Sequence, residues 1–218
     1  MNKAEEIIKK ESELVQRMFR HWTDYMEREV VFWDIPGGPE IHAQNHCERV
    51  LLHALRIGEA QGLPLRSLTA LAHAAIFHDT RRKDNYLDVG HGGRAAKYYK
   101  GHCEHTRLEF LPEAYAAMMY HDRDDSLGDS YIMREGKGEA ARWLTVYHDF
   151  KDADALDRLR LGTWCLDEKY LRCQEAKGMV GYAQWLVEQT TNPVALKRVY
   201  DMMMPFRKPF AQEGGGDS

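Results

Sequence analysis

The sequence lacks several features that would place it in particular classes of protein. Its 218 residues include four cysteines, and no two of them form a C-x-x-C pair. A chain of this length needs no disulfide framework to fold, so we expect free thiols and a cytoplasmic location. The first residues are charged and lack the apolar core of a signal peptide, and no run of 18 apolar residues is present, so we expect no membrane partner.

An excess of basic charge is also missing. The chain has 30 Lys and Arg against 34 Asp and Glu, which gives a net charge of -4. Duplex nucleic acid is therefore not an expected partner, because proteins that bind it neutralise many phosphates with clustered basic residues. A short basic cluster remains able to bind a small phosphate, and the sequence does not indicate an oligomeric state.

No segment shows the sustained alternation of apolar and polar residues that is typical of half-buried strands. Apolar residues recur instead at spacings of three and four, which is the pattern of amphipathic helices. We therefore predict an all-α fold, a helical bundle in one domain of roughly eight to ten helices.

Breaks in the apolar pattern predict where the elements lie. Residues 3–33 predict one long amphipathic helix, and the Pro- and Gly-rich segment 34–39 separates it from the rest. We expect residues 1–34 to pack on a core of residues 40–165, residues 166–210 to add helices to the same domain, and residues 211–218 to be a disordered tail. Further helices are predicted over residues 41–60, 65–79 (with Ser67 as a cap), 91–99, 112–122, 139–160, 167–175 and 193–203, with a loop over residues 124–138.

One stretch carries chemistry next to an apolar run. Residues 69–77 are mostly small and apolar, and they end abruptly in the adjacent pair His78-Asp79. A His and an Asp at the end of a buried helix need partners, because burying them unpaired costs several kcal/mol. A divalent metal ion is one such partner, and a polar helix end that faces water is the alternative.

Two other segments carry residues that could join this pair. His46 stands in the run H-C-E-R-V on the preceding predicted helix, and Asp154 stands in K-D-A-D-A-L-D far downstream. Asp154 comes four residues after Phe150, which places it near the apolar face of its helix. Three helices could thus supply two imidazoles and two carboxylates to one point, although Asp152 is an alternative to Asp154.

These residues resemble the HD superfamily of metal-dependent phosphohydrolases. Its pattern is a His, then a His-Asp pair, then a final Asp on helices of an all-α domain, and here it is met by His46, by His78-Asp79 and by Asp154. The resemblance covers about residues 40–165 and implies that these four residues ligate a divalent metal, which could be Mn, Fe, Co, Ni, Zn or Mg. It also favours Asp154 over Asp152, because the family's last Asp comes two residues before a Leu.

Some members of this superfamily hold a second metal with extra histidines between the pair and the last Asp. His91 and His121 lie in that interval. The resemblance to the dinuclear members implies that these two residues ligate a second ion. The alternatives are that His91 caps a helix and that His121 is an exposed helix end.

The expected activity is hydrolysis of a phosphomonoester or phosphodiester of a nucleotide or similar small phosphate. Asp79 would help to orient the attacking water, as the superfamily implies, and Arg82 stands where some dinuclear members carry a lysine for phosphate. Arg49 and Lys151 are second candidates for this role. Nucleotidase members place acidic residues soon after the pair, whereas this sequence has Arg81-Arg82-Lys83 there. The substrate of those members is therefore not directly inferred for this protein.

Other interpretations stay open at this point. The dipeptides His121-Asp122 and His148-Asp149 compete with the pair at 78–79, which has the most apolar preceding run. A non-catalytic binding module could share this fold. A dinuclear-iron oxygenase is a third possibility, because HD-type sites with extra histidines can hold redox iron.

Overall fold

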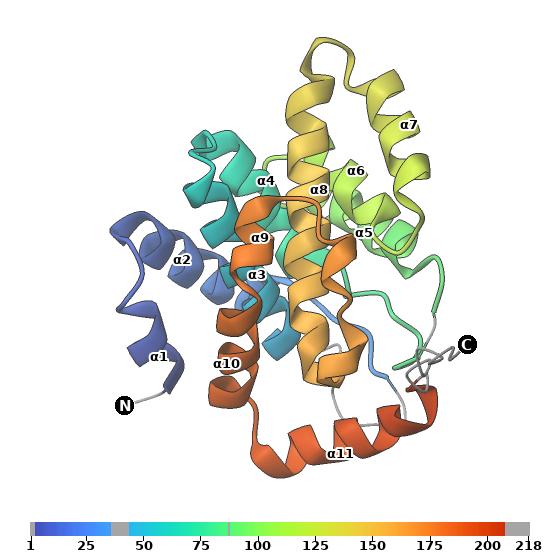
Figure 1. Cartoon of the computed structure of the whole chain (residues 1–218). Coiled ribbons are helices and arrows are strands. Elements are labelled where there is room, and N and C mark those ends of the chain that lie inside the picture. The colour runs from blue at the N-terminus through green and yellow to red at the C-terminus, as the bar shows by residue number, and fades with distance from the viewer. Residues whose placement is uncertain (1–2, 36–43, 87, 208–218) are drawn as a thin grey trace, which may run out of the picture.

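The chain folds entirely into helices and connecting segments in a computed structural model that describes residues 3–35, 44–86 and 88–207 (Figure 1). No strand occurs within these ranges, so the prediction of an all-α fold is confirmed. The predicted tail, residues 211–218, lies outside the described residues. Among the described residues, no helix is long and apolar enough to cross a membrane.

The α-helices follow one another along the chain. They are α1 (Lys3–Ile8), α2 (Glu13–Glu29), α3 (Gln44–Ala60), α4 (Leu65–Phe77), α5 (His91–His105), α6 (Pro112–Tyr120), α7 (Asp125–Glu135), α8 (Ala140–Leu156), α9 (Gln174–Gly178), α10 (Val180–Thr190) and α11 (Pro193–Met203). A 3-10 helix, η2 (Asp157–Leu161), continues α8.

Helices α3, α4, α6 and α8 form the centre of the molecule. Helix α8 packs on α3, α4 and α6, and α3 packs along α4 (Figure 1). Helix α4 is apolar around almost its whole circumference, with ten of its residues buried, as expected for a helix enclosed by others. Polar groups at its end are therefore held in a dry environment.

The N-terminal region differs from the prediction of one long helix over residues 3–33. Helix α1 ends at Ile8, and α2 begins after Ser12, whose hydroxyl accepts a hydrogen bond from the Val15 amide at 3.1 Å. This side-chain cap satisfies a free N–H group and starts a new helix. Helix α2 then packs on α3 and α4 through an apolar stripe.

Residues 30–35 follow α2 as an extended segment rather than as the buried end of a helix. The Trp33 amide donates to the carbonyl of Thr80 at 3.0 Å, and Arg81 donates to the carbonyl of Val31 at 2.5 Å. These long-range bonds replace helical ones. They hold the segment against the residues that directly follow the His78-Asp79 pair.

The predicted loop over residues 124–138 is wrong, because α7 occupies most of it. Asp124 caps this helix by accepting from the Ser126 amide at 3.0 Å, and Ile132 is buried. At Gly128 a Cβ atom would collide with the ring of Tyr147 from α8. The glycine that suggested a loop is thus a point of close helix packing.

The C-terminal region also departs from the prediction. Residues 167–175 contain a 3-10 turn and the start of the short α9, and α10 was not anticipated from the sequence. Helix α11 begins at Pro193 as predicted, behind an Asn192 side chain that accepts from two amides. Ser67 lies inside α4, not at its cap, because Pro64 precedes the helix.

Candidate metal centre

The His78-Asp79 pair lies at the C-terminal end of α4, inside the molecule. The exposed fractions of these residues are 0% and 4%, so water does not solvate either side chain well. The Nδ1 atom of His78 donates to the carbonyl of Ala75 at 2.8 Å, which leaves Nε2 without a hydrogen. That nitrogen lies 3.0 Å from Nε2 of His46 on α3.

A first cluster consists of His46, His78, Asp79 and Asp154. Nε2 of His46 lies 3.5 Å from Oδ2 of Asp79 and 3.3 Å from Oδ1 of Asp154. Nε2 of His78 lies 3.9 Å and 3.7 Å from the same two oxygens. Three helices, α3, α4 and α8, thus bring four potential ligand atoms to one point.

A second cluster consists of Asp79, His91 and His121. Oδ1 of Asp79 lies 3.1 Å from Nε2 of His91 and 3.8 Å from Nε2 of His121, and these two nitrogens are 2.8 Å apart. His91 is the first residue of α5, and His121 directly follows α6. Both side chains are buried, so neither is an exposed helix end.

Asp79 belongs to both clusters, with one carboxylate oxygen facing each. Oδ2 is directed to His46 and His78, and Oδ1 to His91 and His121. The structure therefore brings together all six residues that the sequence proposed as metal ligands. A carboxylate shared in this way can bridge two cations.

The imidazoles are oriented from behind by acceptors. Nδ1 of His91 lies 2.7 Å from the carbonyl of Asp88, and Nδ1 of His121 lies 2.8 Å from the carbonyl of Met118. A carbonyl can only accept, so these Nδ1 atoms carry the hydrogen and each Nε2 presents a lone pair. Metal-ligating histidines are usually held in this way.

Asp157 on η2 orients His46, a role that was not predicted from the sequence. Its Oδ2 accepts from Nδ1 of His46 at 2.7 Å, and it is fully buried. Burial alone would raise the pKa of Asp157, but the Arg49 guanidinium and the His46 bond hold it well below its usual value. The sequence contained a signal for this role, since Asp157 follows Asp154 by three residues and so shares its helix face.

Arg49 was predicted as a catalytic candidate, but its bonds go to Asp157. Its Nε and Nη2 donate to the two carboxylate oxygens at 2.6 Å and 3.1 Å. Arg49 therefore contacts a residue behind His46 and acts on the clusters through Asp157. Lys151, a further candidate, pairs with Asp125 at 2.6 Å.

The choice between Asp152 and Asp154 follows from the bonds of Asp152. Its carboxylate accepts from the amides of Arg172 and Cys173 at 2.7 Å and 2.8 Å, and from the Arg172 guanidinium at 2.8 Å. It thus fastens the segment before α9 to α8. Asp154, on another face of α8, is the carboxylate that lies beside His46.

Arg82 lies against the second cluster. Its Nη1 is 3.1 Å from Nε2 of His91 and 3.6 Å from Oδ1 of Asp79, and its Nη2 donates to the carbonyl of Tyr86 at 2.6 Å. Arg81 points elsewhere, with its guanidinium 3.3 Å from the ring centre of Tyr98. Arg82 is thus the basic residue of this segment that reaches the clusters.

Of the two competing His-Asp dipeptides, His148-Asp149 lies away from the clusters, and His121-Asp122 contributes only its histidine to one of them. His148 pairs with Asp129 at 2.8 Å, and Asp149 accepts from Gln61 at 2.9 Å, both away from the clusters. Asp122 accepts from the amide of Gly90, whose φ of +95° suits glycine, and lies 3.5 Å from Nδ1 of His91. It therefore supports the start of α5, a contribution that the sequence analysis also missed.

The protonation states of the first cluster suit a cation. Burial lowers the pKa of His78 to about 3, so this imidazole is neutral near pH 7. Burial opposes ionisation of Asp154, but the neighbouring histidines hold its pKa well below the usual value. The Asp154 side chain is also 27% exposed, against 8% or less for the other five, so the clusters open to solvent on that side.

The donor set fits divalent metal ions. Two unprotonated nitrogens 3.0 Å apart, as in His46 and His78, repel each other unless a cation lies between them. Imidazole nitrogen with carboxylate oxygen is a donor set for Mn, Fe, Co, Ni or Zn. Two buried groups, His46 with His78 and Asp79, and Asp79 with His91 and His121, could each hold an ion.

Comparisons of this chain with models of known protein families, with curated proteins and with solved structures found no match.

Proposed function

We propose that this protein is a metal-dependent phosphohydrolase of the HD superfamily. It would hydrolyse a phosphomonoester or phosphodiester of a nucleotide or similar small phosphate. The observation that carries the proposal is the placement of Asp79, which lies between two groups of histidines and next to a guanidinium.

The two clusters would provide ligands for two ions. His46, His78, Asp79 and Asp154 would hold the first ion, and Asp79, His91 and His121 would hold the second. Divalent ions bound there would polarise a phosphoryl oxygen and make water a better nucleophile near pH 7.

The chain's own residues would bind and orient the substrate. Arg82 carries a permanent charge beside Asp79 and can donate to a phosphoryl oxygen. Its bonds to the backbone of residues 84 and 86 fix its direction, so the charge is in place before substrate arrives. Asp154 lies at the exposed side, where the substrate would enter.

Two other functions remain to be separated from this one. Four imidazoles and two carboxylates also suit a pair of iron ions in an oxygenase. Arg82 favours the hydrolase, because a guanidinium has no evident use in activating oxygen and is suited to phosphate. A non-catalytic module would retain the fold and show no turnover.

Metal analysis of the purified, tag-free protein tests the first step. We expect near two equivalents of divalent metal in the wild type and loss of about one of them in His78→Ala, because His78 belongs to the first cluster only. His148→Ala is the matched control, because His148 is also the first residue of a His-Asp dipeptide but lies outside both clusters. Its metal content should equal that of the wild type, and circular dichroism should show equal helicity in all three proteins.

A screen of aryl phosphates and nucleotides with Mn or Co tests the second step. Hydrolysis that Arg82→Ala reduces by about 10²-fold or more, with metal content kept, supports the role of Arg82. Metal without turnover of any phosphate ester contradicts the hydrolase, and an iron spin signal would then point to the oxygenase. Absence of metal after soaking with Mn would contradict both enzymes.

A further inference from the structure

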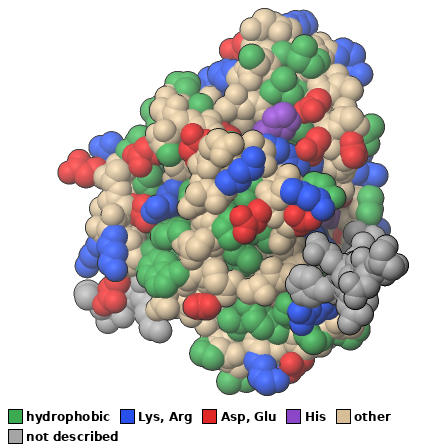
Figure 2. Space-filling view, in the orientation of Figure 1, with side chains coloured by type: hydrophobic (Ala, Val, Ile, Leu, Met, Phe, Trp, Pro, Cys, Tyr) green, Lys and Arg blue, Asp and Glu red, His purple; other side chains and the backbone are tan. Residues whose placement is uncertain are grey.

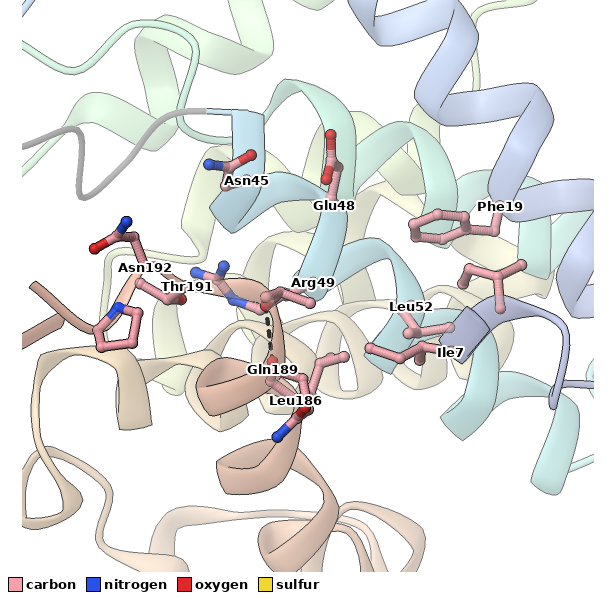
Figure 3. Close-up of a pocket in the computed structure, with 13 residues that line it drawn as sticks. Ile7, Phe19, Asn45, Glu48, Arg49, Leu52, Leu186, Gln189, Thr191 and Asn192 are labelled. Carbon is pink, nitrogen blue, oxygen red and sulfur yellow. Dashed lines mark hydrogen bonds between the residues drawn. The ribbon is translucent and has the colours of Figure 1, made fainter. Parts of the chain in front are cut away.

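A cavity of about 520 Å³ lies outside both clusters. It is lined by α1 and α2, by the first turns of α3, and by the end of α10 with the start of α11 (Figure 3). None of the six cluster residues lines it, but Arg49 does. Its size is within the usual range of small-molecule sites.

One end of this cavity is apolar. Phe19, Leu52 and Ile7 lie together there and come from three different helices (Figure 3). Leu52 is buried, and Phe19 is partly buried against the hydrophobic core. A hydrocarbon or aromatic group of a ligand would lose its contact with water at this end.

The other end is polar, with Asn45, Arg49, Thr191 and Asn192 gathered around it (Figure 3). Arg49 is 6% exposed and uses only Nε and Nη2 on Asp157. Its Nη1 makes no hydrogen bond to any described residue. The Thr191 hydroxyl is also buried without a hydrogen-bond partner in the described part of the chain. Two donors are thus available at one place, and an oxyanion would satisfy both.

Glu48 also lines the cavity and opposes an anion. Burial, with a smaller contribution from the charge of Glu27, raises the pKa of this carboxyl above its usual value. Glu48 therefore sets a clear test, because a cavity controlled by its carboxylate would prefer a cation.

We propose that this cavity binds a small amphipathic molecule with an oxyanion at one end and an apolar body. The oxyanion, a carboxylate or phosphate, accepts from Nη1 of Arg49 and from the Thr191 hydroxyl. The apolar body lies against Phe19, Leu52 and Ile7. This site is separate from the proposed phosphohydrolase centre, and its occupation does not require metal.

Binding is measured on the metal-free, full-length protein with anilinonaphthalene sulfonate, a fluorescent anion with an aromatic body. We expect saturable binding of one molecule per chain. Gln189→Trp, which places an indole in the cavity from α10, should weaken this binding by about tenfold or more. Glu188→Trp is the matched control, because the adjacent Glu188 is exposed and does not line the cavity, and it should bind like the wild type.

Competition identifies the charge that the cavity selects. Octanoate should displace the probe, and octylammonium should not. Glu48→Gln should strengthen octanoate binding and Arg49→Gln should weaken it by about tenfold, because one charge-assisted hydrogen bond is lost. Circular dichroism checks that each variant is folded. If Arg49→Gln does not fold, the comparison of Gln189→Trp with Glu188→Trp still tests the proposal.

Two results would overturn the proposal. Equal probe binding by the wild type and Gln189→Trp would place the probe elsewhere on the surface. Displacement by octylammonium rather than octanoate would assign the cavity to Glu48 and to cations. Because the protein is free of metal throughout, neither result bears on the phosphohydrolase proposal.

Discussion

The two clusters share Asp79 but are held by different parts of the molecule. The first cluster rests on α3, α4 and α8, whose mutual contacts form the core. The second cluster depends on the start of α5, which follows a turn at residues 89–90, and on the end of α6, which precedes a turn at residues 121–122. His46 is held by a buried carboxylate, Asp157, whereas His91 and His121 are held by backbone carbonyls.

This difference has a consequence for affinity. Ligands on packed helices lose little freedom when an ion binds, and a carboxylate behind an imidazole makes it a stronger donor. Asp157 lies 2.7 Å behind His46 in this way, whereas the carboxylate behind the second cluster, Asp122, lies farther away, 3.5 Å from Nδ1 of His91. We therefore expect the first cluster to bind its ion more tightly than the second.

The largest effect should come from Asp79→Ala, which removes the ligand that both clusters share. We expect loss of both ions, because each cluster loses a carboxylate oxygen. Metal at about 1,000 times its dissociation constant should stabilise the wild type by about 4 kcal/mol and this variant by almost nothing. Thermal unfolding with and without Mn measures the difference, and retention of one equivalent would contradict the shared role.

Gly92→Ala should affect the second cluster alone. A Cβ atom at this position in α5 would meet the carbonyl of Met118 and lie 2.7 Å from Nδ1 of His121. Moving α5 away from α6 should cost about 1–3 kcal/mol of stability and release one of two metal equivalents. Gly101→Ala is the matched control on the same helix, since nothing lies within 4 Å of its added Cβ. Equal metal content in both variants would show that the second cluster still binds its ion when α5 moves away from α6, and it would contradict this prediction.

Asp157→Asn should weaken the first cluster without removing it. The amide is similar in size, but it accepts less strongly from Nδ1 of His46 and leaves Arg49 without its anion. We expect the tighter of the two metal affinities to fall by about 10–100-fold, the usual cost of losing such a partner. Competition with a coloured chelator measures this affinity. An unchanged affinity would contradict the inference that Asp157 strengthens metal binding at the first cluster.

The smallest effect should come from Asp149→Asn, on α8 but outside both clusters. Burial raises the pKa of Asp149 to about 6, so the folded protein holds this proton more tightly than the unfolded chain does. Ionising Asp149 therefore lowers the stability of the folded protein. This loss of stability is absent below about pH 4, where Asp149 is protonated in both states, and it grows until the pH exceeds about 6. The free energy of unfolding of Asp149→Asn should therefore rise by about 1 kcal/mol relative to that of the wild type as the pH increases from 5 to 7.

Urea unfolding at several pH values measures that difference. Metal content should stay at the wild-type level, which separates the acid response of α8 from that of the clusters. A difference between the two proteins that does not change with pH would contradict the assignment to Asp149.

The sequence predicted the helical class well because the class depends on the spacing of apolar residues. Element ends were predicted less well where tertiary contacts decide them. The turn at Ser12 and the extended segment 30–35 depend on a side-chain cap and on bonds to Thr80 and Arg81. Gly128 suggested a loop, since its packing role appears only when Tyr147 lies against it.

The six proposed ligands could be chosen from the sequence because four of them resemble the pattern of the HD superfamily and the other two are histidines in the interval where its dinuclear members carry theirs. The residues behind them were not chosen, although the spacing of Asp157 from Asp154 was a signal. Asp157 and Asp122 act through contacts with His46 and Gly90, which are distant in the chain. Arg49 looked like a phosphate ligand by composition, and only its two bonds to Asp157 assign it a positioning role.

The position of Asp79 between the clusters also affects the stability of the folded chain. Ions bound there would act as cross-links between segments that begin at His46 and end at Asp154. A cross-link stabilises a protein by limiting the conformations of its unfolded chain, and it does so more strongly when it closes a longer loop. This chain has four free cysteines, so such cross-links would take the place that disulfides have in other proteins. Removing metal should therefore make the connections between α4, α5 and α6 the first sites that a protease cuts.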